Sequence, residues 1–145
     1  MFDDAYFMKK ALVEAKVAFD MDEIPIGAVV VCQNQIIARA HNLTEQLTDV
    51  TAHAEMQAIT AAANYFGGKY LTDCTLYVTV EPCVMCAGAL GWSQIGRVVF
   101  GARDEKRGFQ KLAPEALHVK TELVSGILAD ECGALMQDFF ARKRR

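Results

Sequence analysis

Proline and long uncharged apolar runs are scarce in this sequence, and their scarcity narrows what the chain can be. Only 3 of the 145 residues are proline, and no segment rich in proline, glycine or serine divides the chain. No stretch of about 18 apolar residues is free of charge, as a membrane-spanning helix requires. The N-terminus has no apolar run after a basic start, so we expect no secretory signal. We expect one domain over residues 1–145, located in the cytoplasm and without a membrane segment.

Excess charge of one sign is also lacking. The chain has 15 Lys and Arg against 18 Asp and Glu, a net charge of −3. This charge does not by itself favour a nucleic-acid binder, although a local cluster of positive charge can still bind nucleic acid. Apolar residues make up 52% of the chain, which suffices for a sizeable core and excludes a disordered protein. The 5 cysteines are an odd number without secretory context, so we expect reduced thiols used for packing or metal binding.

Apolar periodicity predicts alternating helices and strands. Helices are expected over residues 3–20, 53–65, 82–92 and 128–139, and strands over residues 24–31, 36–40, 75–80, 97–100 and 117–123. A turn at residues 33–35 makes a hairpin of the first two strands. We expect Thr51 to cap the second helix, Gly67 to end it, and Pro82 to lie in the first turn of the third. A hairpin followed by β-α-β units predicts an α/β fold with one mixed sheet and helices on both faces.

Two short segments carry the residue types of a metal site. His53-Ala54-Glu55 opens one predicted helix, and Pro82-Cys83-Val84-Met85-Cys86 follows a predicted strand and opens another. Cys83 and Cys86 are three positions apart, so both thiols point to one side of a helix whose N-terminus stabilises thiolates. With His53 they offer one nitrogen and two sulfur ligands, which leaves a tetrahedral Zn²⁺ with one open position, as in catalytic sites.

Glu55 supplies the proton chemistry that such a site needs. Zinc lowers the pKa of a water in its open position from ~15.7 to about 7, and Glu55 can take the proton and return it to a ring nitrogen and a leaving amine. Alone, the two cysteines could be a redox pair or half of a structural zinc site, and a lone histidine could be an ordinary core or surface residue. Together the four residues favour catalytic zinc. The other three cysteines are expected in the core.

This H-x-E…P-C-x-x-C pattern is the signature of zinc nucleobase deaminases. Over nearly its whole length the chain resembles the bacterial tRNA-specific adenosine deaminases. The resemblance is strongest over residues 76–89 and 95–104, and it extends to residues 23–29, 51–55 and 126–132. It implies a three-layer α-β-α, cytidine-deaminase-like fold around a mixed five-stranded sheet. It also implies a homodimer that hydrolyses the wobble adenosine of a tRNA anticodon to inosine and releases ammonia.

The resemblance further implies roles for individual residues. It implies that zinc is held by His53, Cys83 and Cys86. It implies that Glu55 moves the protons. Five more positions are implied to contact the substrate or line its pocket: the side chains of Ile26, Asn42 and Asp104, the backbone carbonyl of Glu81, and the backbone N–H of Ala54. Without the resemblance, Asn42 is interpreted as a turn residue after a strand, and Asp104 as a loop residue that begins a turn.

Two other functions stay open. Trp92 and the loop after Asp104 depart from the tRNA enzymes, and Trp92 is closer to guanine deaminases, so a deaminase of free guanine, cytosine or a nucleoside is the alternative. A pocket closed by the C-terminal segment would favour that alternative, and an open basic groove would favour RNA. A non-catalytic zinc scaffold or RNA-binding subunit is a third possibility, and the presence of Glu55 counts against it.

Several surface features would serve RNA or a second copy. Positive charge in the loop and at the C-terminus could meet phosphates, and an aromatic side chain could stack on a base. These residues are Lys106, Arg107 and Lys111, the cluster at residues 142–145, and Phe109. The apolar surface around Gly88 to Trp92 is the expected dimer contact. An exposed loop and a solvated helix end explain the same charges without RNA.

Overall fold

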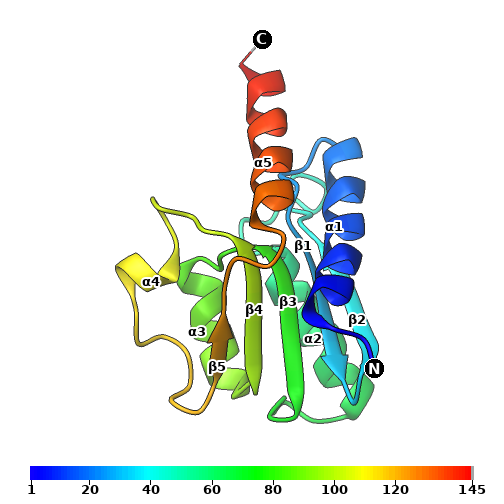
Figure 1. Ribbon diagram of the computed structural model, residues 1–145, viewed down its shortest axis with the longest axis vertical. Coiled ribbons are helices and arrows are strands. Elements are labelled where there is room, and N and C mark those ends of the chain that lie inside the picture. The colour runs from blue at the N-terminus through cyan, green and yellow to red at the C-terminus, as the bar shows by residue number, and fades with distance from the viewer. Residues whose placement is uncertain (145) are drawn as a thin grey trace.

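The computed structural model describes residues 1–144 and places a five-stranded sheet between two layers of helices (Figure 1). The helices are α1 (Asp4–Asp20), α2 (Ala54–Phe66), α3 (Val84–Ser93), α4 (Phe109–Leu112) and α5 (Ala129–Lys143). The strands are β1 (Gly27–Cys32), β2 (Gln35–His41), β3 (Cys74–Val80), β4 (Arg97–Ala102) and β5 (Glu122–Val124). The predicted α/β class, with one mixed sheet covered on both faces, is confirmed.

The strand order is β2-β1-β3-β4-β5. Strand β1 runs antiparallel to β2 and β3, whereas β3, β4 and β5 are parallel to one another. The turn between β1 and β2 contains Gln33 and Asn34 with φ of 52° and 61°, the left-handed geometry that tight two-residue hairpins require. Because β2 and β3 run in the same direction, the chain leaves both at one edge of the sheet, and the N-termini of α2 and α3 follow there.

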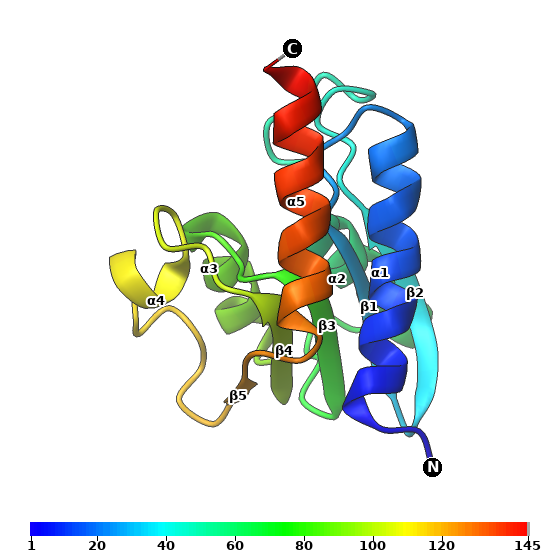
Figure 2. The same cartoon turned by 45° about the horizontal axis from the view of Figure 1, so that its top comes forward.

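Alternate residues of the central strands enter two separate cores, as the two-residue period of a strand requires. One core lies under α2 and α3 and contains Ala28, Val30, Leu76 and Val78 from the sheet. The other lies under α1 and α5 and contains Val29, Val31, Tyr77 and Val99. Figures 1 and 2 show α1 and α5 side by side on one face, with α5 rising past the edge of the sheet. The three remaining cysteines are buried, as predicted: Cys32, Cys74 and Cys132.

Helix starts differ from the expectation in a way that bears on the site. Thr51 does not cap α2, because its N–H and hydroxyl both bond to the carboxylate of Asp49. The residue before α2 is His53, and the residue before α3 is Cys83, so Pro82 lies outside the first turn of α3. Neither the His53 nor the Cys83 side chain makes a capping hydrogen bond. The two side chains instead contact each other.

Strand ends and one short helix also differ. Strand β1 begins at Gly27 rather than at residue 24, because Pro25 cannot donate a hydrogen bond to a ladder. Strand β5 covers residues 122–124 rather than 117–123, since Thr121 N–H bonds to the carbonyl of His118 in a turn. Helix α4 was not expected. Gly67 ends α2 with φ of 71°, as predicted. Within residues 1–144, no helix combines the length and apolarity needed to span a membrane.

Candidate active site

Two helix N-termini bring His53, Cys83 and Cys86 together. His53 precedes α2, Cys83 precedes α3, and Cys86 lies in the first turn of α3. His53 Nδ1 lies 3.6 Å from Cys83 Sγ and 3.5 Å from Cys86 Sγ. Each residue offers one ligand atom, and these three atoms lie within 4.8 Å of one another. Residues about 30 positions apart in sequence therefore form a compact set of one nitrogen and two sulfur donors.

The three side chains compete for protons. A hydrogen bond with Cys86, assisted by one with His53, lowers the pKa of the Cys83 thiol to about 4 despite its burial. The hydrogen bond with Cys83 raises the pKa of His53, and the hydrogen bond with Cys83 together with burial raises the pKa of Cys86. Thiolates and neutral imidazole are the forms that bind metals, and metal binding releases the protons they hold. The donor set fits a zinc ion.

Glu55, the second residue of α2, lies against this cluster. Its side chain is only 3% exposed, and its Oε1 is a buried polar atom without a hydrogen-bond partner within residues 1–144. Burial raises the pKa of the carboxyl to about 7. An unpaired buried oxygen is costly, and in native proteins it marks a place for a ligand, a water or a function. The acid is thus suited to exchange protons with a group held between it and the three ligands.

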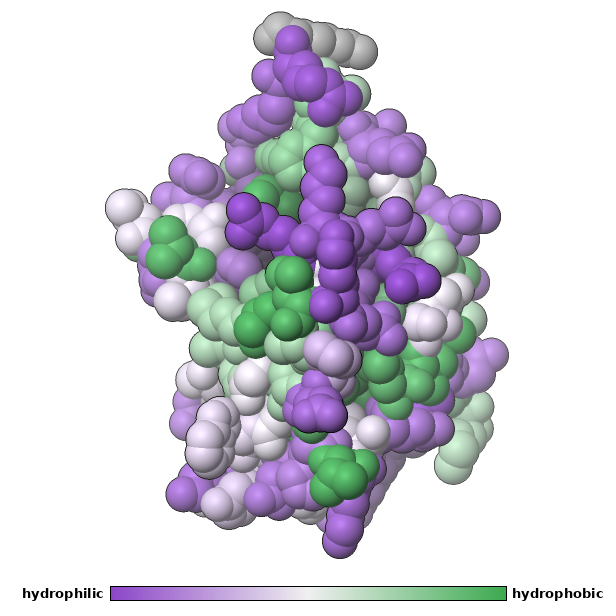
Figure 3. Space-filling model, turned by 90° about the vertical axis from the view of Figure 1, so that its left-hand side faces the viewer, coloured by the Kyte–Doolittle hydropathy of each residue, from purple (hydrophilic) through white to green (hydrophobic). Residues whose placement is uncertain are grey.

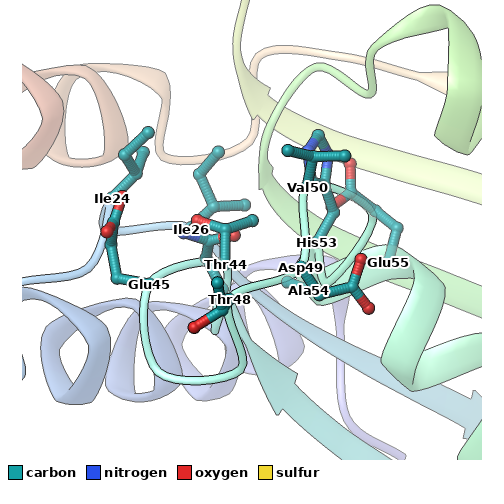
Figure 4. Close-up of a pocket in the computed structure, with 11 residues that line it drawn as sticks. Ile24, Ile26, Thr44, Glu45, Thr48, Asp49, Val50, His53, Ala54 and Glu55 are labelled. Carbon is teal, nitrogen blue, oxygen red and sulfur yellow. Dashed lines mark hydrogen bonds between the residues drawn. The ribbon is translucent and has the colours of Figure 1, made fainter.

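A cavity of about 460 Å³ extends from His53 and Glu55 to the loop that follows β2 (Figure 4). Ile26 and Asn42 line it, and Ala54 contributes the start of α2, where backbone N–H groups lack partners within the helix. The loop after β2 also lines it: Thr44, Glu45 and Thr48 lie away from His53, whereas Asp49 and Val50 lie beside it (Figure 4). The structure therefore brings three of the expected substrate positions to the metal cluster.

Glu23 is a buried acid at this cavity to which the sequence analysis assigned no role. It is 0% exposed and accepts hydrogen bonds from Asn42 Nδ2 and from the N–H groups of Glu45 and Gln46. Its sequence signal is an acid placed directly before the apolar run that leads into β1. That signal alone does not identify its partners, because they lie about 20 residues further along the chain.

A second hollow, of about 680 Å³, shares His53 and Glu55 with the first and runs toward the loop after β4 and one face of α5. Glu81 and Asp104 both shape that loop. The Glu81 carboxylate accepts from the N–H groups of Asp104 and Gln110, each at 3.1 Å. One Asp104 carboxylate oxygen accepts from the N–H groups of Lys106 and Arg107 at 3.1 and 3.0 Å. The structure thus assigns this Asp104 oxygen to the turn.

The outer part of the site is basic. Three cations and one acid line an adjoining hollow together with residues of α5: Lys106, Arg107 and Arg144, Asp104, and Met136, Gln137 and Phe140. Figure 3 views this side of the molecule and shows hydrophilic side chains gathered on its upper part, next to apolar surface. The C-terminal helix forms one wall of this groove, and exposed side chains of the loop after β4 form the other.

Two expectations about the RNA-facing residues change. Phe109 is 1% exposed as the first residue of α4, so the expectation that it stacks on a base is wrong. Its ring is buried because α4 folds it back against the protein. Lys111 is exposed but is not among the residues that line the groove. Arg145, the last member of the C-terminal cluster, lies outside the described residues.

Known proteins with similar sequences and structures are deaminases. The chain matches the MafB19-like deaminase family over residues 2–144. It is 46% identical to a tRNA-specific adenosine deaminase of Bacillus subtilis, over 100% of this chain and 93% of that protein. A solved structure from a study of A-to-I editing by tRNA:A34 deaminases at the wobble position of transfer RNA has a TM-score of 0.84 and 41% identity, over 90% of this chain and 98% of that one. A guanine deaminase of Bacillus subtilis gives a TM-score of 0.67 and 38% identity, over 70% of this chain and 66% of that one.

Proposed function

Because the chain belongs to the family of tRNA-specific adenosine deaminases, we propose that it hydrolyses the wobble adenosine of a tRNA anticodon to inosine. The observation that carries this proposal is the cluster of His53, Cys83 and Cys86 beside a buried acid with an unpaired oxygen. That cluster lies at the base of a groove whose outer part is basic. A groove with a basic outer part favours an RNA loop, whereas a free nucleobase such as guanine or cytosine, or a nucleoside, is the alternative substrate.

The metal that fits the cluster is Zn²⁺. His53 would provide an imidazole nitrogen, and Cys83 and Cys86 would provide thiolates, a three-ligand set typical of catalytic zinc with an open position. When bound, zinc supplies an activated water as the nucleophile at neutral pH. The lowered pKa of Cys83 favours one of the two thiolates before any metal arrives.

Glu55 is the proton carrier of the reaction. It takes a proton from the attacking water as the water oxygen bonds to C6 of adenine, and it delivers that proton to ring nitrogen N1. It then moves the remaining proton of the added oxygen, now a hydroxyl on C6, to the amino group, so that the C6–N bond breaks and ammonia leaves. A carboxyl with a pKa of about 7 can both accept and donate a proton near neutral pH. The Glu81 backbone carbonyl would face the departing amine.

The remaining contacts hold the nucleotide. Ile26 would form an apolar wall of the base pocket, and Asn42 and the Ala54 N–H would be polar contacts to the nucleotide. Lys106, Arg107 and Arg144 would meet phosphates of the anticodon loop, since phosphate contacts dominate nucleic-acid affinity. The second Asp104 oxygen would be available to accept from a ribose hydroxyl near the target nucleotide. A single-stranded loop presents an unstacked base, so no duplex has to be opened.

We also propose that the enzyme is a cytoplasmic homodimer. All five cysteines are free thiols, as is typical of proteins in a reducing compartment. Trp92 on α3 is 86% exposed, and so large an apolar side chain in solvent is typical of a contact with another protein surface. The family resemblance implies a homodimer, and we assign this contact to the second copy of the chain.

The deciding experiment uses zinc-loaded protein and an anticodon stem-loop with adenosine at the wobble position. We expect inosine in the wild-type reaction, detected by mass spectrometry. Glu55→Gln keeps the shape but cannot carry the proton, so we expect a rate about 10²- to 10⁴-fold lower. Its zinc content should remain that of the wild type.

Two outcomes would contradict the proposal. An unchanged stem-loop together with rapid turnover of free guanine would favour the alternative substrate. A Glu55→Gln variant as active as the wild type would remove the proton role of Glu55 and favour a different catalytic acid.

A further inference from the structure

Glu23 takes no part in the proton chemistry, yet it is fully buried and completely bonded. Its Oε1 accepts from Asn42 Nδ2 at 3.3 Å and from Glu45 N–H at 3.0 Å, and its Oε2 accepts from Gln46 N–H at 2.7 Å. Burying a carboxylate is costly even when it is hydrogen-bonded. The bond to Asn42 is the one through which this acid can act on the cavity.

A carboxylate beside an asparagine decides which end of the amide faces it. Each Glu23 oxygen accepts a backbone N–H, and Asn42 turns its NH₂ group toward Oε1. Thr44 Oγ1 accepts the second hydrogen of the same nitrogen at 3.2 Å. Both donors of Asn42 are therefore used inside the protein, and its Oδ1 carries the remaining hydrogen-bonding capacity.

The Asn42 Oδ1 is accessible. It has no hydrogen-bond partner within residues 1–144, and among those residues the buried side-chain atom left without a partner is Oε1 of Glu55. Oδ1 is thus open to whatever fills the cavity that Asn42 lines together with His53 and Glu55. The protein presents an acceptor at this point and no donor.

An acceptor restricts which part of an adenosine can bind there. The ring nitrogens of adenine accept hydrogen bonds and cannot pair with Oδ1. Within an RNA strand an adenosine has two kinds of donor, its 6-amino group and its ribose 2′-hydroxyl. The amino group leaves at Glu55, so the 2′-hydroxyl is the donor that remains for Asn42. The 2′-hydroxyl is also the group that distinguishes RNA from DNA.

We propose that Glu23 is a positioning residue that orients Asn42 as a hydrogen-bond acceptor for the ribose 2′-hydroxyl of the target nucleotide. The ribose part of this inference rests on the proposed function, whereas the orientation of Asn42 does not. Asn42, which the family resemblance assigns to the base, then reads the sugar and makes the site selective for RNA.

The first test compares two stem-loops that differ only in ribose or 2′-deoxyribose at the wobble adenosine. For the wild type we expect kcat/KM to be about three- to tenfold higher for the ribose form, the effect of one neutral hydrogen bond. Glu23→Gln introduces an NH₂ group that lets Asn42 turn over, so the ratio should fall to within about twofold of one.

The matched control is Asp4→Asn, the same change of carboxylate to carboxamide at the start of α1. Asp4 is bonded to Arg97 and Tyr77, away from the groove, so this variant should lose stability and keep the wild-type ratio. Asn42→Ala should abolish the ribose preference and serves as a second variant if Glu23→Gln does not fold. In the double variant Glu23→Gln with Asn42→Asp, the new amide can donate to the new carboxylate, which restores an acceptor and should restore the preference.

The second test needs no substrate. In proton–nitrogen NMR spectra, the Asn42 side-chain NH₂ signals, assigned with Asn42→Ala, should exchange slowly with solvent in the wild type and rapidly in Glu23→Gln. Unchanged exchange would overturn the positioning role. A wild type that processes both sugars equally, or a Glu23→Gln that keeps the full ratio, would overturn the ribose contact. Failure to deaminate either stem-loop refutes the proposed function and the ribose contact, while the NMR result still decides the positioning of Asn42.

Discussion

Cys83 and Cys86 belong to one motif but hold their protons very differently. Cys83 shares hydrogen bonds with Cys86 and His53 that lower the pKa of its thiol to about 4, whereas the deeper Cys86 has a raised pKa. Of the two thiols, Cys83 therefore gives up its proton more readily. A zinc ion would need to displace the Cys86 proton, so we expect metal loading to slow as the pH falls.

The metal assignment can be tested by one substitution and a matched control. Cys83→Ala removes one of three donors, and we expect its zinc content to fall to a small fraction of the wild-type value, as measured by metal analysis of purified protein. Cys132 is 1% exposed and packs between α5 and the sheet. Cys132→Ala should therefore lower the free energy of unfolding by about 1 kcal/mol and leave the zinc content unchanged. Full zinc content in Cys83→Ala would mean that another residue is the ligand.

At the scale of elements, a buried glutamate holds each side of the groove. Glu23 accepts hydrogen bonds from two backbone N–H groups of the loop after β2, and Glu81 accepts from that of Asp104, in the loop after β4, and that of Gln110, in α4. Both acids lie at the edge of the sheet where α2 and α3 begin. Backbone N–H groups of loops need partners when they are buried, and these two carboxylates provide them. The shape of the groove therefore depends on residues that do no chemistry.

Gly108 shows how closely the second loop is packed. A Cβ at this position would overlap the Glu81 carboxylate and crowd the Asp104 carbonyl. We expect Gly108→Ala to shift the loop, to lower the free energy of unfolding by about 1 to 3 kcal/mol and to raise KM for the stem-loop. Gly68→Ala is the control, because nothing lies within 4 Å of a Cβ there. Equal KM values for both variants would show that this loop does not contact the RNA.

The start of α1 is joined to the sheet by a charged contact. The Asp4 carboxylate accepts from both terminal nitrogens of Arg97 at 2.7 and 2.8 Å, and from the Tyr77 hydroxyl at 2.7 Å. The hydrogen bond with Arg97 lowers the pKa of Asp4 below its ordinary value of 3.8. The folded protein thus binds this proton less tightly than the unfolded chain does. The contribution to stability is complete above pH 3.8 and is lost as the pH falls through the lowered pKa.

Asp4→Asn therefore has a pH-dependent signature. At pH 7 we expect the free energy of unfolding to fall by about 1 kcal/mol, since the pair is 27% exposed and solvent screens it. Below pH 3.8 the difference from the wild type should shrink, because the wild-type carboxylate is protonated there. Urea unfolding at a series of pH values measures both effects. A constant difference down to pH 2 would contradict the assignment.

At the scale of the whole molecule, the side that carries α3 and α4 has unusually exposed apolar residues. Trp92 is 86% exposed and Val119 is 91% exposed. The segment around Ala116 packs directly on Gly91, which places the chain leading to Val119 beside Trp92. Figure 3 shows apolar patches on this side. Exposed apolar groups gathered in this way are typical of a protein–protein contact.

We expect light scattering to show a dimer for the wild type and a monomer for Trp92→Arg, because an arginine in an apolar contact has to lose its hydration. The control is Tyr65→Arg. Tyr65 is 65% exposed near the end of α2, outside the expected contact, so this variant should stay dimeric. A monomeric wild type would refute the dimer.

Much of this protein follows from the sequence because its determinants are local. A period of two or 3.6 residues in apolar side chains is enough to predict the central strands and the long helices. The short spacings from His53 to Glu55 and from Cys83 to Cys86 place each pair at one helix start. The family resemblance then implies that the two starts meet at a metal. None of these inferences requires knowledge of which distant residues touch.

The rest was decided by tertiary structure, because it depends on contacts between segments far apart in the chain. Glu23 reaches Asn42 only after the β1–β2 hairpin has formed. Phe109 lies in a stretch of charged residues, which suggests an exposed ring. The ring is buried rather than presented to RNA because α4 folds against the protein. The order of helices and strands was set by local pattern, whereas the residues that begin α2 and α3 and the orientation of a single amide in the cavity were set by packing.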